Sequence, residues 1–435
     1  MVDEVLPSSW CWSTLAEVAD PNSRAIVSGP FGSNIGRRFF VEKGVPVIRG
    51  NNLTTDMKRF VDDGFVFVTE KKADELGNCD AVVDDLVFTA AGSLGQVGII
   101  PKTTKHSRYI ISNKQLRARV DKRRVDPLFA FYWFSSNRMV EYIQQRNTGS
   151  SVPLINLSVL RSLPIPLPPV AEQRAIAHIL GTLDDKIELN RRMNETLEAM
   201  ARAIFTSWFV DFDPVRAKIE GRWRPGQSLP GLPAHLYDLF PDRLVNSELG
   251  EIPEGWEVGR LDDLLVLQRG FDLPKTQRTP GAYPVIAASG PSETHNEYRA
   301  KGPGVVTGRS GVLGRVFYVQ QDFWPLNTTL WVKDFRTAQP LYAYHLIAKL
   351  GFDAFNAGSA VPTLNRNHVH GLPAVLPPGD LVEHFERFGR AFFQKFRTND
   401  LESRTLAAVR DTLLPKLISG ELRVKDAEGF LGRYA

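Results

Sequence analysis

Two kinds of hydrophobic pattern alternate along this 435-residue chain. Short runs rich in Val, Ile, Phe and Tyr, such as PVIRGNNL, DLVFTAA and QVGII, are punctuated by Gly, Pro and Asn, which is typical of strands joined by turns. Two longer stretches, in which apolar residues recur about every three and a half positions, predict long amphipathic helices. The predicted order is a head of mixed strands and helices, a long helix, a linker, a second head and a second long helix.

Each predicted long helix begins directly after a Pro-Pro pair, Pro168-Pro169 in the first case and Pro377-Pro378 in the second. The segment LPIPLPP cannot continue a helix or a central strand, so we expect it to be a stiff exit from the first head. The apolar stripe of the first helix comprises Ile176, Ile179, Leu183, Ile187, Leu197, Met200 and Ile204. The stripe of the second comprises Leu381, Phe385, Phe388, Phe392, Leu406, Val409, Leu413 and Leu417.

The two stripes have two interpretations. Either each helix packs on its own head, or the two helices pack on each other as a coiled coil. An internal duplication of the chain favours the coiled coil, because related stripes suit a pseudo-two-fold pairing. The polar residues Asn190, Asn194 and Asn399 interrupt the stripes, and such residues can set the register of a coiled coil at some cost in stability.

The duplication is visible as an offset of 209 residues between NTGSSVPLINLSVLRSLPIPLPP, which begins at Asn147, and NAGSAVPTLNRNHVHGLPAVLPP, which begins at Asn356. Four earlier pairs of segments match in the same order, including PLFAFYWF with PLYAYHLI and DDLVFTAAGSLGQVG with PGVVTGRSGVLGRVF. Five matches in one order indicate two related halves. We therefore divide the chain into a first head (1–168), a first helix (169–215), a linker (216–250), a second head (251–376), a second helix (377–424) and a tail (425–435).

Composition narrows the class of protein. A hydrophobic content of 43% and a charged content of 23% argue against wholesale disorder, and a net charge of +4 is only mildly basic. No apolar run reaches the roughly 18 residues of a membrane-spanning helix, and the first residues lack the pattern of a signal peptide. Cys11 and Cys79 are too far apart in sequence to indicate a disulfide framework, so a cytoplasmic protein fits best.

The segment PLPPVAEQRAIAHILGTLDDKIELNRRMNETLEAMARAIFTSWF resembles the central helical region of the specificity subunits of type I restriction–modification enzymes. The segments FVDFDPVRAKIEGR and LPAHLYDLFPDRLVNSELGEIPEGWEV resemble their central linker. The layout of that family covers essentially the whole chain. The second helix departs from the first, because LPPGDLVEHFERF lacks the pair present as Glu172-Gln173.

The resemblance implies an α+β (mixed α/β) fold: two similar target-recognition domains separated by two long helices that form an antiparallel coiled coil with a pseudo-two-fold. It implies a non-catalytic subunit that binds double-stranded DNA at an asymmetric bipartite target. It also implies two methyltransferase subunits and restriction subunits as partners. S-adenosylmethionine, ATP and magnesium would belong to those partners, with no cofactor and no metal in this chain.

The sequence lacks the catalytic motifs that this chain would need if it were itself a modification or restriction enzyme. An enzyme that methylates an extruded base would need a motif of an acidic residue or Asn, then Pro, Pro and an aromatic residue. Both Pro-Pro pairs of this chain are followed by a non-aromatic residue, Val170 or Gly379. The phosphate cradle GxxxxGK[ST] does not occur, and GSLGQVG precedes IIP rather than a helix, so a turn is expected. We expect His368, His370 and His384 not to form a metal site, because no cysteine or carboxylate at a suitable spacing completes the set of ligands. Asp184-Asp185 and Asp262-Asp263 are expected on solvated helix faces, although the sequence leaves a carboxylate-rich nuclease centre open.

Candidate DNA-binding residues are spread over both heads. Arg can bind guanine, and Asn or Gln can bind adenine, through two hydrogen bonds, whereas Lys and many Arg side chains hold phosphates. The candidates in the first head are Ser33, Asn34, Arg37, Arg38, Arg49, Asn51, Asn52, Asn113, Lys114 and Gln115. Those in the second head are Gln268, Arg269, Lys275, Thr276, Arg278, Arg309, Ser310, Arg315 and Asn327. We expect several of them, but not all, to touch DNA.

The lengths of the two helices could set a fixed distance between two DNA sites. A helix of about 40 residues is about 60 Å long, so an antiparallel pair could hold two heads against short DNA sites roughly one turn, or about 34 Å, apart. Because the heads differ in sequence, the two half-sites should differ. Two alternatives remain: a coiled-coil protein-interaction scaffold without DNA specificity, and a fused modification or restriction enzyme that binds the methyl donor itself.

Overall fold

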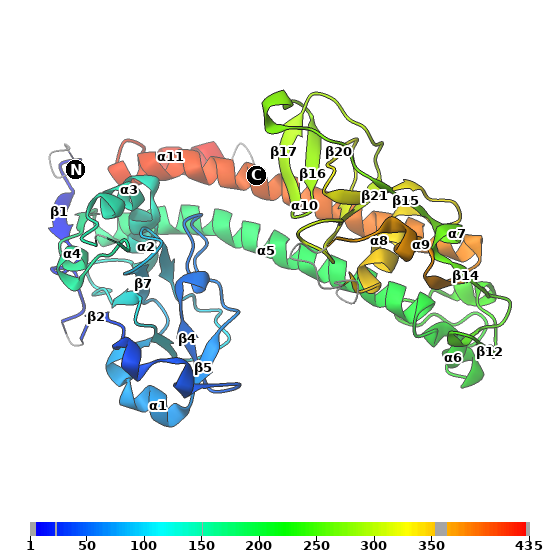
Figure 1. Ribbon diagram of the computed structural model, residues 1–435. Coiled ribbons are helices and arrows are strands. Elements are labelled where there is room, and N and C mark those ends of the chain that lie inside the picture. Colours follow the sequence, from blue (N-terminus) through cyan, green and yellow to red (C-terminus); the bar gives the residue numbers. More distant parts are fainter. Residues whose placement is uncertain (1–5, 22–23, 150, 353–362, 432–435) are drawn as a thin grey trace. The chain divides into compact units, whose positions relative to one another are not determined.

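The computed structural model describes residues 6–21, 24–149, 151–352 and 363–431 (Figure 1). The chain divides into a first unit, Met1–Asn190 with Leu401–Ala435, and a second unit, Arg191–Asp400. Each unit contains one head together with parts of both long helices, α5 (Val170–Phe209) and α10 (Gly379–Ser419). Among the described residues, no helix has the length and apolar character needed to cross a membrane.

The first head contains two main sheets. The antiparallel sheet β2-β10-β7-β8 has the bounds Ile26–Ser28, Gln115–Ala118, Leu86–Thr89 and Val97–Ile99. The sheet β3-β5-β4-β9-β6 has the bounds Phe40–Val41, Val66–Val68, Val45–Ile48, Tyr109–Ile111 and Asp80–Ala81. A separate pair joins β1 (Cys11–Thr14) to β11 (Pro164–Leu167), which is the Pro-rich exit predicted from the sequence.

The helices of the first head are α1 (Glu70–Glu75), α2 (Pro127–Ser135), α3 (Asn137–Gln145) and α4 (Leu157–Arg161). Helix α2 begins at Pro127 because the Asp126 side chain caps it, accepting hydrogen bonds from the Leu128 and Phe129 amides. This helix is apolar on all sides and is buried from Phe129 to Ser135, as a central core helix should be. It therefore lies at the centre of the first unit.

The second head repeats this plan. Its sheet β15-β21-β18-β19 corresponds strand for strand to β2-β10-β7-β8 and has the bounds Val266–Arg269, Thr329–Asp334, Gly304–Gly308 and Val316–Val319. The pair β14–β22 (Glu257–Arg260 and Pro373–Leu376) corresponds to β1–β11. The other sheet, β17-β16-β20, is smaller, with the bounds Gly290–His295, Tyr283–Ala287 and Trp324–Pro325. The helices are α7 (Leu261–Leu264), α8 (Pro340–Lys349) and α9 (Arg366–His370).

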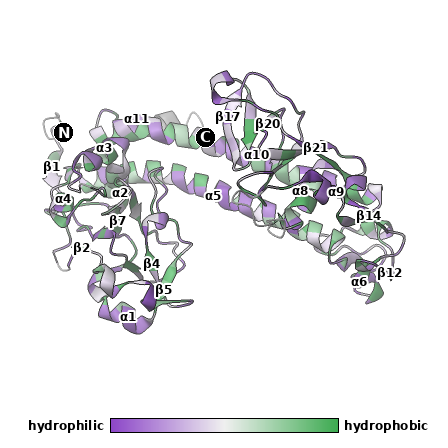
Figure 2. Cartoon of the chain, in the orientation of Figure 1, coloured by the Kyte–Doolittle hydropathy of each residue, from purple (hydrophilic) through white to green (hydrophobic). Residues whose placement is uncertain are grey.

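The two long helices pack on each other in antiparallel directions within each unit. In the first unit, Asp184 contacts Arg410, and Asn190 donates to Glu402 at 2.8 Å. In the second unit, the Asn399 side chain donates to Asn194 at 2.8 Å. The partner's number falls as the number in α5 rises, which confirms the predicted antiparallel pairing. Figure 2 shows hydrophobic and hydrophilic residues interspersed along both helices.

Both interpretations of the apolar stripes hold at different positions. Among the stripe residues, those buried together with head residues are Ile176, Ile179, Leu183, Leu381, Phe385, Leu413 and Leu417. The half-buried ones are Ile187, Leu197, Ile204, Phe388, Phe392, Leu406 and Val409. Met200 is 45% exposed and lines an open hollow with Trp208 and Leu232. The stripes thus dock each head and also join the helices.

The linker is folded rather than loose. Helix α5 ends at Phe209, and Phe212, with a φ of 54°, turns the chain into α6 (Asp213–Ile219). A 3₁₀ helix (Ala234–Leu239) and the hairpin β12–β13 (Leu244–Ser247 and Gly250–Pro253) follow. Trp223, which is 1% exposed, packs edge-on against Tyr237. The second long helix likewise ends at Ser419, before α11 (Val424–Leu431).

Candidate nucleic-acid interface

Several loops of the first head leave the same end of the sheet β2-β10-β7-β8. Strand β2 ends where β10 begins, and the Gly29 amide donates to Gln115 at 2.9 Å. Strand β7 ends beside the same point, because the Ala90 amide donates to the Lys114 carbonyl at 2.8 Å. We call the loops 29–39, 90–96 and 112–114 the first sheet-end surface. The antiparallel register therefore gathers segments that are far apart in the sequence.

Glycine makes this close gathering possible. A Cβ atom at Gly29 would lie 1.8 Å from the backbone oxygen of Ser112, so any larger residue would push the two loops apart. The corresponding position in the second head is Gly270, where a Cβ atom would lie 2.2 Å from the backbone oxygen of Leu326. Both heads thus have a glycine at the corresponding end of corresponding sheets, where two loops approach each other closely.

The first sheet-end surface carries basic and amide side chains. Its exposed candidates are Ser33, Asn34, Arg37, Arg38, Asn113 and Lys114. The Arg38 guanidinium donates to the Ser33 carbonyl at 2.9 Å and lies 4.7 Å from the centre of the Phe39 ring. These contacts hold the loop in one shape. An ordered cluster of this kind suits the binding of phosphates and base edges.

Arg49 and Asn51 lie on a neighbouring loop. This loop follows β4, whose last residue, Ile48, accepts a hydrogen bond from the Ser112 amide at 2.9 Å. The side chains of Arg49 and Asn51 both donate to the Gly64 carbonyl, at 3.3 and 3.2 Å. The loop therefore borders the first sheet-end surface and is tied to the segment around Gly64.

Two candidates of the first head are internal. Asn52 is fully buried, and its amide donates to the Val61 and Asp63 carbonyls at 2.9 and 2.8 Å. Gln115 is 1% exposed, and its side-chain oxygen accepts a hydrogen bond from the Ser112 hydroxyl. These polar groups are occupied in shaping the loops, so we leave both residues out of the sheet-end surface.

The second head has an equivalent surface on the loops 270–278, 309–315 and 326–328. The Gly270 amide donates to Thr329 at 3.1 Å and the Arg309 amide donates to Thr328 at 2.8 Å, which repeats the pattern of the first head. The exposed candidates on or beside this second sheet-end surface are Arg269, Lys275, Thr276 and Arg315. The half-buried ones are Gln268, Arg278, Arg309, Ser310 and Asn327.

Carboxylates partly offset the positive charge of this second surface. Asp272 lies 3.8 Å from the Arg269 guanidinium and accepts a hydrogen bond from the Asn327 amide. Arg278 forms a 3.0 Å ion pair with Glu293. The two heads therefore share a backbone plan but present different charge patterns.

An aromatic residue on the first sheet-end surface was not among the candidates. Phe31 is 83% exposed and lies between the buried Pro30 and the exposed Gly32. An aromatic ring held in water at a loop tip can stack on bases or enter a base step. The sequence does contain a signal for this residue, because Phe31 is an apolar side chain inside the turn sequence GPFGSN. The candidates were chosen among polar residues, so Phe31 was not included.

Of the three histidines considered from the sequence, His370 and His384 make local contacts and His368 is exposed. The His370 ring accepts a hydrogen bond from the Leu267 amide at 2.8 Å, and burial lowers its pKa. His384 contacts the Asp380 carbonyl one turn earlier in α10. Within the described residues, no group of three or more His, Cys, Asp or Glu side chains could hold a metal ion. Residues 92–96 of the GSLGQVG segment form the predicted turn between β7 and β8, and its last two residues begin β8.

Residues 35–199 and 253–380 match the family described as the type I restriction modification DNA specificity domain. The chain is 26% identical over 411 residues to the type I restriction enzyme MjaIX specificity subunit of Methanocaldococcus jannaschii, covering 88% of each chain. It is 26% identical over 376 residues to the HindI specificity subunit of Haemophilus influenzae, covering 72% of this chain and 81% of that one. The type I restriction-modification S subunit from M. genitalium has a similar fold, with a TM-score of 0.58 at 15% identity over 96% of this chain and 97% of that chain.

Proposed function

This chain belongs to the type I restriction–modification DNA specificity family, and on that premise we propose that it recognises an asymmetric, two-part DNA sequence, one part with each head. The observation that carries the proposal is the pair of sheet-end surfaces. They are built from duplicated segments on the same backbone plan, yet they present different side chains. Two heads that share a fold but differ in their surface side chains would recognise two different half-sites.

Recognition would divide between two kinds of contact. Exposed cations such as Arg37, Lys114 and Lys275 would bind phosphates and fix the position of each head on the duplex. Arginine and amide side chains of the same loops would read base edges in the groove. Phe31 would add a stacking contact that depends little on base identity.

The chain would act without chemistry of its own. Two methyltransferase subunits would assemble on the long helices, and restriction subunits would join them for cleavage. S-adenosylmethionine, ATP and magnesium would be bound by those partners. The proposal is supported by the match of both heads to the specificity domain.

Sequencing of modified bases in cells with and without this gene tests the proposal. We expect an interrupted motif with two different halves to be modified only when the gene is present. Binding of purified complex to a duplex with this motif should weaken steeply as salt rises, because phosphate contacts release counterions. Identical modification in both strains, or DNA affinity independent of salt, would instead support a protein-interaction scaffold. Methyl transfer by the purified chain alone would contradict the non-catalytic role.

A further inference from the structure

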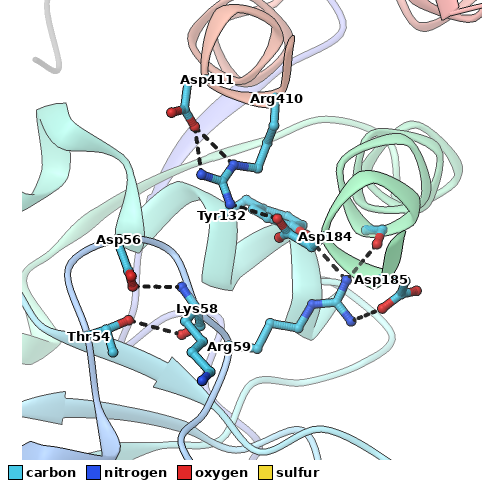
Figure 3. A network of polar contacts seen from close by, with 10 residues as sticks. Thr54, Asp56, Lys58, Arg59, Tyr132, Asp184, Asp185, Arg410 and Asp411 are labelled. Atoms are coloured by element: carbon cyan, nitrogen blue, oxygen red, sulfur yellow. Dashed lines mark hydrogen bonds and ion pairs between the residues drawn. The ribbon is translucent and has the colours of Figure 1, made fainter. Parts of the chain in front are cut away.

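A largely buried carboxylate joins the first head to both long helices. Asp184 on α5 accepts a hydrogen bond from the Tyr132 hydroxyl of α2 at 2.5 Å and pairs with the Arg410 guanidinium of α10 at 2.7 Å (Figure 3). The side chains of Asp184 and Arg410 are only 11% and 9% exposed. We expected Asp184 on a solvated helix face, and this was wrong for Asp184 but correct for Asp185, which is 70% exposed.

A second arginine completes the network from the opposite side. Arg59 lies on the loop between β4 and β5 of the head, and its guanidinium pairs with Asp185 at 2.8 Å. The same guanidinium donates to the Gly181 carbonyl of α5 at 2.9 Å and to the Tyr132 hydroxyl at 3.4 Å. A loop of the head, a core helix of the head, α5 and α10 therefore meet around the neighbouring carboxylates of Asp184 and Asp185.

The equivalent place in the second head is built differently. The duplication aligns Tyr132 with His345 and Asp184 with Phe393. His345 is 4% exposed and stacks on Phe205 with the ring centres 5.5 Å apart. The second head is also joined to the helices by directional bonds, since the Tyr344 hydroxyl of α8 donates to Glu198 of α5 at 3.3 Å. The Leu341 amide of α8 donates at 2.8 Å to Glu386 of α10, which is 2% exposed. The two heads are therefore held by different sets of contacts.

We propose that Asp184 is a positioning residue that fixes the first head on the helix pair, and that it thereby sets the separation at which the first half-site is read. The inference rests on the proposed two-part recognition. Successive base pairs are about 3.4 Å apart along the duplex, so a reader that distinguishes spacers differing by one base pair must be held to a smaller tolerance. Hydrogen bonds weaken within a few tenths of an ångström of their best length, and packing against a helix alone permits more sliding.

The experiment uses the full chain assembled with its methyltransferase partners. The probes are duplexes that carry both half-sites of the motif found by sequencing modified bases, with the natural spacer or with one base pair added or removed. We expect Asp184→Asn to reduce the preference for the natural spacer by roughly tenfold, which corresponds to about 1.4 kcal/mol. Discrimination against a single changed base within either half-site should stay within about twofold, because the sheet-end surfaces are untouched.

Two further variants keep the test decisive. Tyr132→Phe removes only the hydroxyl that joins α2 to Asp184, so it should relax the spacer preference in the same direction if Asp184→Asn does not fold. Asp426→Asn is the matched control, because Asp426 is an exposed aspartate on α11 outside this network, and it should keep the wild-type preference.

The outcomes separate the two hypotheses. An unchanged spacer preference in Asp184→Asn and Tyr132→Phe, or an equal loss of affinity for every spacer, overturns the positioning role. Absence of a two-part motif with the wild-type chain contradicts the proposed function itself. A wild-type preference that relaxes in both variants and persists in Asp426→Asn supports the assignment.

Discussion

The side chain of Gln173, at the start of α5, accepts a 2.9 Å hydrogen bond from the backbone amide of Asp126, the residue that caps α2. The Gln173 amide also donates to the carbonyls of Arg124 and Pro168, at 3.0 and 2.9 Å. Because Gln173 is fully buried, one side chain satisfies three backbone groups at the junction of head and helix.

Replacing this glutamine should therefore destabilise the first unit. We expect Gln173→Ala to lower the free energy of unfolding by about 1–3 kcal/mol, since three buried polar groups lose their partner. Chemical denaturation followed by tryptophan fluorescence measures the change. The control is Gln145→Ala, at an exposed position of α3, which should shift the midpoint little. Equal midpoints for the two variants would show that water replaces the lost bonds.

The stability of the second unit should depend on pH through His345. Burial lowers the pKa of this histidine from 6.5 to about 4, and Arg202 acts in the same direction. The unfolded chain therefore binds a proton below about pH 6.5 that the folded chain refuses until about pH 4. Stability should fall as the pH decreases through this window, by on the order of 3 kcal/mol in total.

The measurement is the unfolding free energy at several pH values between 4 and 7 for the wild type and for His345→Phe. The variant should lose most of this slope, since a phenyl ring preserves the stacking on Phe205 but cannot titrate. Glu386 is buried nearby, and burial raises its pKa, so it gives a slope of the opposite sign above about pH 4.5 that both proteins share. Parallel curves for the two proteins would exclude His345 as the source.

Cations of the first sheet-end surface should control the salt dependence of DNA binding. Arg37→Ala and Lys114→Ala should each reduce the slope of log affinity against log salt by about one. Lys122→Ala is the control, because Lys122 pairs with Asp84 at the opposite end of the sheet. Titrations at several salt concentrations give the slopes. A slope that Arg37→Ala and Lys114→Ala leave unchanged would remove this surface from the interface.

Phe31 should behave differently from the cations. We expect Phe31→Ala to weaken binding of the modified motif by about 1–3 kcal/mol, the usual worth of one stacked base, and to leave the salt slope unchanged. Val41→Ala is a control of similar chemistry, since Val41 is an exposed apolar residue on β3. Phe31→Trp should retain most of the affinity. If Phe31→Ala binds like the wild type, the ring is only an exposed side chain.

Much of the architecture could be predicted from the sequence, because it rests on periodicity. The apolar runs PVIRGNNL, DLVFTAA and QVGII became β4, β7 and β8, and both long helices begin just after their Pro-Pro pairs. The duplication predicted two heads of one plan, which the matching sheet orders confirm. These features depend on local residue choice, which a single sequence displays directly.

The tertiary roles of individual polar residues could not be predicted in the same way. Asn51 and Asn52 are neighbours with the same side chain, yet Asn51 is exposed and Asn52 is fully buried. Likewise, the neighbours Asp184 and Asp185 have the same side chain, yet Asp184 is 11% exposed and Asp185 is 70% exposed. Burial of a polar residue depends on partners that are distant in the sequence, such as Arg410, and those partners have no local signature.

The division of the long helices between the units has a consequence for synthesis on the ribosome. Leu413, Leu414, Leu417 and Ile418 of α10 lie in one core with α2 and the first strands of the chain. A Cβ atom at Gly420 would even lie 2.4 Å from the Pro7 side chain. The second unit is one continuous segment and can close as soon as it emerges, whereas the first must wait for nearly the whole chain. Domains usually fold in the order of their synthesis, but here the first head made is the last to be completed.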